Sequence, residues 1–139
     1  MINVFLDSDV IISSLISILG ASYQLINNKN INCFISNISY KELLLVVKRL
    51  NIDEKKLKAV VKEKLKIVKL SQNLKQIKLN YKNCVKDLND AHIVAGAVES
   101  KVNFLITFNL KDFEINRIKE KYNIKIMSPG TFLQFLRSK

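Results

Sequence analysis

The acidic residues of this 139-residue chain number only 12, and six of them stand where a predicted strand ends or a predicted helix begins. They are Asp7, Asp9, Glu42, Asp87, Asp90 and Asp112. Clustered carboxylates raise one another's pKa unless a divalent cation neutralises them. A set of Asp, Glu and Asn oxygens suits Mg²⁺ or Mn²⁺ rather than Zn²⁺. The residue types therefore predict a magnesium or manganese site, provided that the fold brings them together.

Each of these acids also has a structural interpretation at a helix N-terminus. Asp7, Asp87 and Asp112 could be N-caps, Asp9 could favour the positive end of a helix dipole, and Asp90 lies at capping-box spacing from Asp87. The segment Ser39-x-x-Glu42 also has the spacing of a capping box, which by itself would explain Glu42. A metal site is favoured because an acid directly after an apolar strand, such as Asp7, is costly unless a cation lies beside it.

The elements that must position these residues alternate between short apolar runs and helical patterns. Strands are predicted at Ile2–Leu6, Asn32–Ser36, Ile67–Leu70, Asn103–Thr107 and Ile124–Met127. Helices are predicted from Asp7 to about Leu19 with Gly20 as a stop, then over 39–50, 53–65, 71–83, 87–100 and 113–122, and from Ser128-Pro129 onward. This alternation predicts an α/β fold, a three-layer α/β/α sandwich with a mostly parallel sheet, formed by a single domain over residues 1–139. Ligands of such sheets bind beyond the carboxyl ends of the strands, where the acids are predicted.

The formal net charge of +11 comes largely from the middle of the chain. The segment Lys41–Lys86 contains thirteen Lys and one Arg against four acids, a local charge of +10. Such a field attracts a polyanion by phosphate neutralisation and counterion release. A proteome rich in Lys would give the same excess without any partner, so charge alone leaves both interpretations open.

The remaining features exclude several other classes of protein. Cys33 and Cys84 are isolated thiols, and His92 is the only histidine, so no structural zinc site is predicted. His92 is interpreted as structural because its i, i+2 spacing from Asp90 does not place both on one helix face. The start of the chain lacks the features of a signal peptide, and Val10–Leu19 is too short for a membrane span. We therefore expect a cytoplasmic protein without a membrane partner.

Four segments, in order along the chain, resemble the motifs of the PIN domain family. They are Phe5-Leu-Asp7-Ser-Asp9-Val-Ile, where the family usually reads Leu-Asp-Thr-Asn-Val, Ser39-Tyr-Lys-Glu42-Leu-Leu, Asp87-Leu-Asn-Asp90-Ala-His-Ile-Val-Ala-Gly-Ala, and Leu105-Ile-Thr107-Phe-Asn109-Leu-Lys-Asp112-Phe. The segment Met127-Ser-Pro-Gly-Thr-Phe-Leu is similar to the C-terminal part of many members. The resemblance extends over essentially the whole chain.

The resemblance implies a metal-dependent ribonuclease, most often of the VapC type, the toxin of a toxin–antitoxin pair. Matching the motifs implies the following residues: Asp7, Glu42 and Asp90 as catalytic acids, these three with Asn109 and Asp112 as metal ligands, and Asp9, Asp87, Ser8 and Thr107 as auxiliary residues. The helices of the basic segment Lys41–Lys86 would then flank the site and hold the RNA backbone, with Lys41, Lys48, Arg49 and Lys86 as RNA-binding residues. Mg²⁺ or Mn²⁺ would lower the pKa of a water for in-line attack on the phosphodiester. The implied partners are RNA, a cognate antitoxin protein and a second copy in a homodimer.

The chain departs from the family pattern at two positions. Asn109 stands where many members have Asp, with Asp112 three residues later, and Asp9 stands where Asn is usual. Asn109 leaves open a second interpretation, a non-catalytic PIN-like module that binds RNA or another protein. A receiver domain fits poorly because Glu42 lies inside a predicted helix, and a nucleotide-binding domain lacks its glycine-rich loop.

Overall fold

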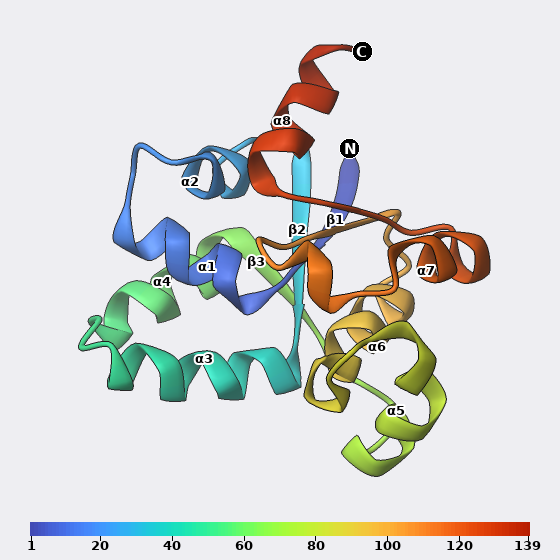
Figure 1. Cartoon of the computed structure of the whole chain (residues 1–139). Coiled ribbons are helices and arrows are strands. Elements are labelled where there is room, and N and C mark those ends of the chain that lie inside the picture. Colours follow the sequence, from blue (N-terminus) through green and yellow to red (C-terminus); the bar gives the residue numbers. More distant parts are fainter.

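Five parallel strands form one sheet in the order β3-β2-β1-β4-β5 in the computed structural model, which describes residues 1–139 (Figure 1). The strands are β1 (Ile2–Leu6), β2 (Ile31–Ser36), β3 (Leu65–Val68), β4 (Phe104–Ile106) and β5 (Lys125–Met127). Every neighbouring pair runs parallel, so the predicted mostly parallel sheet is confirmed and is parallel throughout.

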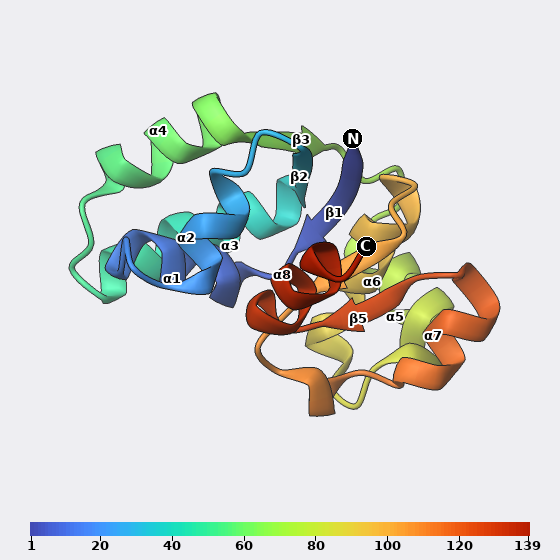
Figure 2. The same ribbon diagram turned by 90° about the horizontal axis from the view of Figure 1, so that it is seen from above.

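Eight α-helices cover the two faces of this sheet. They are α1 (Ser8–Ile16), α2 (Ala21–Ile26), α3 (Asn37–Arg49), α4 (Glu54–Lys64), α5 (Leu74–Tyr81), α6 (Ala91–Glu99), α7 (Ile115–Tyr122) and α8 (Pro129–Arg137), with short 3₁₀ turns η1 (Lys82–Cys84), η2 (Leu88–Asp90) and η3 (Leu110–Asp112). Helices α1 to α4 and α8 pack on one face and α5 to α7 on the other, so the predicted three-layer sandwich is confirmed (Figure 2). None of the helices combines the length and the apolar character that crossing a membrane requires.

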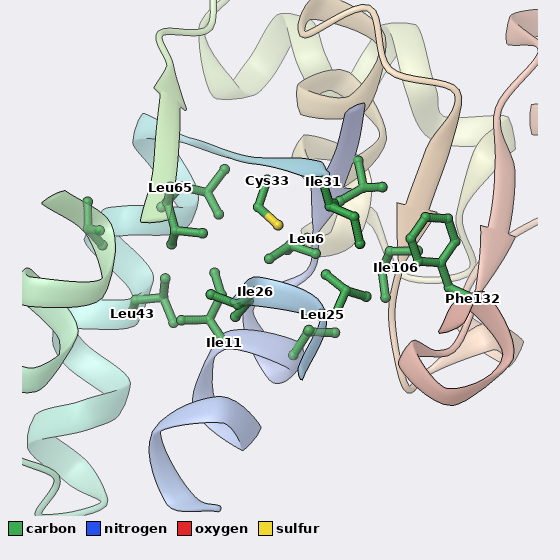
Figure 3. Packing of buried hydrophobic residues seen from close by; sticks show 14 of the residues in the cluster. Leu6, Ile11, Leu25, Ile26, Ile31, Cys33, Leu43, Leu65, Ile106 and Phe132 are labelled. Atoms are coloured by element: carbon green, nitrogen blue, oxygen red, sulfur yellow. The ribbon is translucent and has the colours of Figure 1, made fainter. Parts of the chain in front are cut away.

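The central strand β1 is buried on both faces, and its side chains alternate between the two cores. Val4 and Leu6 belong to the cluster shared with α1 to α4 and α8, where Figure 3 shows Leu6 near the centre of the packed side chains. Phe5 belongs to the opposite cluster, and its ring lies against Gly96 of α6, where an added Cβ would overlap it. Glycine at position 96 therefore lets α6 approach β1 closely, and α6 is the helix that begins after Asp90.

The helix starts differ from the predicted ones in ways that bear on the acids. Ser36, not Ser39, caps α3 by accepting a hydrogen bond from the Ser39 N–H at 3.0 Å. The predicted Ser39–Glu42 capping box is therefore wrong, and Glu42 lies in the second turn of α3 with no capping role. The predicted cap by Asp112 is also wrong, because α7 begins at Ile115 after Glu114.

Three further features differ from the prediction. Helix α2 was not predicted, and it begins after Gly20 without any side-chain cap. Asn73, rather than Ser71, caps α5 through a reciprocal capping box with Gln76. Strand β3 lies two residues earlier than predicted and ends at Val68.

Candidate metal centre

The carboxyl ends of β1 and β4 meet where the strand order reverses. From β1 the chain adds β2 and β3 on one side and later crosses to add β4 and β5 on the other. The Asp7 N–H donates to the Ile106 carbonyl at 3.0 Å, which places the first residue after β1 beside the first residue after β4. In open parallel sheets, ligands bind in the crevice at such a switch point.

Asp7 is both a helix cap and a member of the switch-point cluster. One carboxylate oxygen accepts from the Ser8 N–H at 2.7 Å, and the other accepts from the hydroxyl of buried Thr107 at 2.9 Å. The Thr107 hydroxyl in turn accepts from the Asn109 N–H at 3.0 Å, which fixes its direction. Burial, helped by the charge of Asp9, raises the pKa of Asp7 from 3.8 to about 6. Burial and the nearby Asp9 thus make the ionised form of the Asp7 carboxylate less favourable.

Asp9 lies in the first turn of α1 and contacts the loop after β4. Its Oδ2 accepts from the Phe108 N–H at 3.1 Å and from the Asn109 side-chain amide at 2.9 Å. Its Oδ1 is buried and has no hydrogen-bond partner. Burial raises the pKa of Asp9 above its usual range. The contact with Phe108 cannot be predicted from residue types, because its donor is a backbone N–H group, which every residue except proline has.

Asp90 and Asp112 approach the same edge of the sheet from two other segments. Asp90 precedes α6 without making a side-chain capping bond, so its spacing from Asp87 does not reflect a capping box. Burial, helped by the charges of Asp7 and Asp112, raises the pKa of Asp90 from 3.8 to about 6. Asp87 is exposed and caps η2 by accepting from the Asn89 N–H at 2.9 Å. Asp90 and Asp112 thus belong to the cluster, with Asp87 at its edge.

The carboxylate of Glu42 contacts a histidine side chain. Its Oε1 lies 2.8 Å from Nε2 of His92, with the Glu42 side chain 50% exposed and that of His92 6% exposed. Both residues line a groove of about 610 Å³ between α3, α5 and η2. Sequence reasoning missed this contact because it joins residues on different helices, which no local spacing reveals.

The family follows from the match of the sequence to a known domain. The family model that describes the PIN domain matches residues 3–111. This chain belongs to the PIN domain family. Comparison with curated proteins finds no match.

Several solved structures share the fold of this PIN domain. A VapBC2 structure from Rickettsia felis, bound to a DNA fragment from its promoter, contains a chain 20% identical, with 90% of this chain and 97% of that chain covered at a TM-score of 0.67. A toxin–antitoxin complex from Klebsiella pneumoniae is 22% identical, with 91% and 97% covered at a TM-score of 0.64. DNA-bound VapBC from Salmonella typhimurium is 18% identical, with 93% and 99% covered at a TM-score of 0.62.

The acids of this PIN domain fit a hard divalent cation. No three His, Cys, Asp or Glu side chains converge into a complete ligand set. Mg²⁺ retains several waters and is commonly bound through one or two carboxylates, so it does not require a closed cage. The buried Asp9 Oδ1 lacks a partner, and Asp7 and Asp90 carry pKa values raised by burial and nearby like charge. One or two of the carboxylates of Asp7, Asp9 and Asp90 would hold the ion together with water, with the charge of Asp112 nearby.

The four predicted RNA-binding residues occupy two different kinds of place. Lys41 lines the groove with Glu42, and Lys86 lines a second groove of about 650 Å³ beside η3. Lys48 and Arg49 lie in the last turn of α3, about 9 Å or more beyond Glu42 along the helix axis. Lys41 therefore lies beside Glu42 and Lys86 beside η3, whereas the other two lie toward the C-terminal end of α3.

Proposed function

We propose that this PIN domain is a metal-dependent endoribonuclease that hydrolyses RNA phosphodiester bonds with Mg²⁺ or Mn²⁺. The observation that carries the proposal is the cluster of Asp7, Asp9 and Asp90 at the switch point of the sheet. Burial raises the pKa of each of these carboxylates, and no Lys or Arg forms an ion pair with them. A divalent cation would offset both the burial of these negative charges and the repulsion between them. This supports a metal-binding role for the three residues rather than a structural one.

The residues around the cluster can each have a separate role in hydrolysis. When bound, Mg²⁺ or Mn²⁺ would supply a water of lowered pKa and stabilise negative charge on the phosphate and leaving oxygen. The Thr107 hydroxyl donates to Asp7 and thereby orients this carboxylate. Glu42, held by His92, lines the adjacent groove, where it can accept a hydrogen bond from water. Lys41, beside Glu42, and Lys86, beside η3, would hold the phosphate backbone.

The catalytic proposal is tested by cleavage of RNA in Mg²⁺, in Mn²⁺ and in EDTA. We expect cleavage only with the metals, and we expect Asp7→Asn to lower the rate by about a hundredfold or more because it removes a charge from the metal centre. Asp53→Asn is the matched control, because Asp53 is exposed and caps α4, where Asn serves equally well. Undiminished cleavage by Asp7→Asn would contradict the proposal. If RNA binds without cleavage and millimolar Mn²⁺ gives no calorimetric signal, the chain is a non-catalytic binding module.

We also propose that the nuclease is the cytoplasmic toxin of a toxin–antitoxin pair, working as a homodimer. The support is the fold that this chain shares with chains of the VapBC and toxin–antitoxin structures. The sequence identity between those chains and this one is 18–22%. Expression in a bacterial host should arrest growth with the wild-type chain and not with Asp7→Asn. Co-expression of a small neighbouring reading frame that encodes a DNA-binding antitoxin should relieve the arrest. Absence of such a reading frame would favour an RNA-processing nuclease instead.

A further inference from the structure

We infer that Asp9 supplies the carboxylate that completes the metal centre opposite Asp7, with Asn109 as the residue that positions it. The inference rests on the metal site of the proposed function, but it does not depend on which substrate is cut.

The first support is the direct contact between the two side chains. Asn109 Nδ2 donates to Asp9 Oδ2 at 2.9 Å, across 100 residues of sequence. A carboxylate can only accept hydrogen bonds, so the amide must turn its NH₂ group toward Asp9. The pair joins the first turn of α1 to the loop after β4 and therefore spans the switch point of the sheet.

The second support is that only one of the two carboxylate oxygens of Asp9 accepts hydrogen bonds. Oδ2 accepts from the Phe108 N–H at 3.1 Å and from Asn109, with the Thr107 hydroxyl 3.4 Å away. Oδ1 is buried without a partner, a condition that is rare for polar atoms in folded proteins. One oxygen is thus anchored while the other remains free, which suits a carboxylate that binds a cation through a single oxygen.

The third support is the charge of the pair. The pair consists of one carboxylate and one amide, so it brings a single negative charge to the site. Two carboxylates there would repel each other, and two amides would leave the centre one charge short. An exchange of the two residue types would keep one carboxylate and one amide, so we expect the exchanged pair to retain the function of the native pair.

Four proteins test this inference: the wild type, Asp9→Asn, Asn109→Asp and the double exchange. The readouts are Mn²⁺ affinity by calorimetry at fixed pH and salt, and thermal unfolding in EDTA. We expect Asp9→Asn to weaken Mn²⁺ binding by about tenfold or more. The double exchange should return the affinity to within about threefold of the wild type. Asn109→Asp alone should lower the melting temperature in EDTA, and the double exchange should restore it.

Asp53→Asn serves again as the control for loss of a remote carboxylate and should leave the Mn²⁺ affinity unchanged. A double exchange that binds Mn²⁺ as weakly as Asp9→Asn would overturn the inference, and so would wild-type affinity in Asp9→Asn. Should Asp9→Asn not fold alone, the affinity of the double exchange relative to the wild type decides. If the exchange pattern holds but RNA is not cut, the proposed function fails and the inference stands. If RNA is cut and Asp9→Asn binds Mn²⁺ with wild-type affinity, the inference fails and the proposed function stands.

Discussion

The acidic edge of the sheet and the lysine-rich helices carry opposite charges in opposite physical settings. Asp7 and Asp9 are partly buried, hydrogen-bonded to the loop after β4 and crowded by other carboxylates. The lysines of α3, α4 and α5 are exposed, except for half-buried Lys78. Lys58, paired with Glu54 at 3.3 Å, is the only lysine of the chain in an ion pair. The acidic edge therefore has fixed geometry and unrelieved repulsion, whereas the basic surface has flexible geometry and charge that is free for a partner.

The difference shows that the two regions respond to different variables. Binding of a cation at the acidic edge depends on relief of repulsion, so it is sensitive to pH and to packing. Binding of a polyanion to exposed lysines depends on counterion release, so it is sensitive to salt. Changes of pH and of packing therefore test the acidic edge, and changes of salt test the basic surface.

The largest effect that we expect is a loss of metal-free stability as the pH rises from about 4 to about 7. The pKa of Asp7 is about 6 in the folded protein against 3.8 as its ordinary value, so the folded state retains a proton in this interval that the unfolded state has released. Stability therefore falls as the pH rises through the interval, and the full cost is present above the folded pKa. For Asp7 the cost is on the order of 2–3 kcal/mol, and Asp90 acts in the same direction.

Urea unfolding in EDTA at several pH values measures this effect, with the difference between the wild type and Asp7→Asn as the readout. The variant should be the more stable protein at pH 7 and should lose this advantage near pH 4. Adding Mn²⁺ at pH 7 should stabilise the wild type more than the variant. Parallel pH profiles for the two proteins would show that the acidic edge carries no repulsion.

A smaller effect is expected from Gly96→Ala, which tests how packing forces the acids together. A Cβ at this position overlaps the ring of Phe5 in the core, so α6 must move away from β1 or the ring must turn. We expect a loss of about 1–3 kcal/mol in the free energy of unfolding, although Ala favours a helix over Gly by about 1 kcal/mol. Gly130→Ala is the control, because its Cβ meets nothing within 4 Å. A stabilised Gly96→Ala protein with full Mn²⁺ affinity would show that close packing of α6 on β1 does not hold the centre together.

The smallest effects are expected on the basic side. Lys41→Ala and Lys86→Ala should each reduce the slope of log affinity for RNA against log salt by about one, as expected for loss of one phosphate contact. Lys48→Ala should leave the slope unchanged, because Lys48 lies at the far end of α3. Fluorescence anisotropy in a salt series measures the slopes, in an Asp7→Asn background that prevents cleavage. Equal effects of Lys41 and Lys48 would show that the whole basic surface binds RNA diffusely.

The sheet and the placement of acids at its edge could be predicted from the sequence. A buried strand such as β1 reads as an apolar run, and the polar residue that ends it must lie at the carboxyl edge. The same reasoning places Thr107 and Asn109 after β4. Two of the four segments that resemble PIN motifs contain these strand ends, and the family match confirms the resemblance.

The pairings within the site could not be predicted in the same way. The contacts of Asp9 with Asn109 and of Glu42 with His92 join distant segments, so they depend on strand order and helix packing rather than on local pattern. The start of α3 was misjudged because Ser36 and Ser39 are both good caps, and tertiary structure selects the first.

The central position of β1 also affects when the site can form. Asp7 is synthesised 100 residues before Thr107, the residue whose hydroxyl orients it. At about 5–20 residues per second, the ribosome needs roughly 5–20 s to produce that intervening chain. Until β4 emerges and adds to the open edge of β1, the nascent protein has Asp7, Asp9 and Asp90 but lacks Thr107 and Asn109, whose side chains donate to Asp7 and Asp9. For a nuclease of the kind proposed, the hydrogen bonds that orient these two acids would form only in the last part of translation.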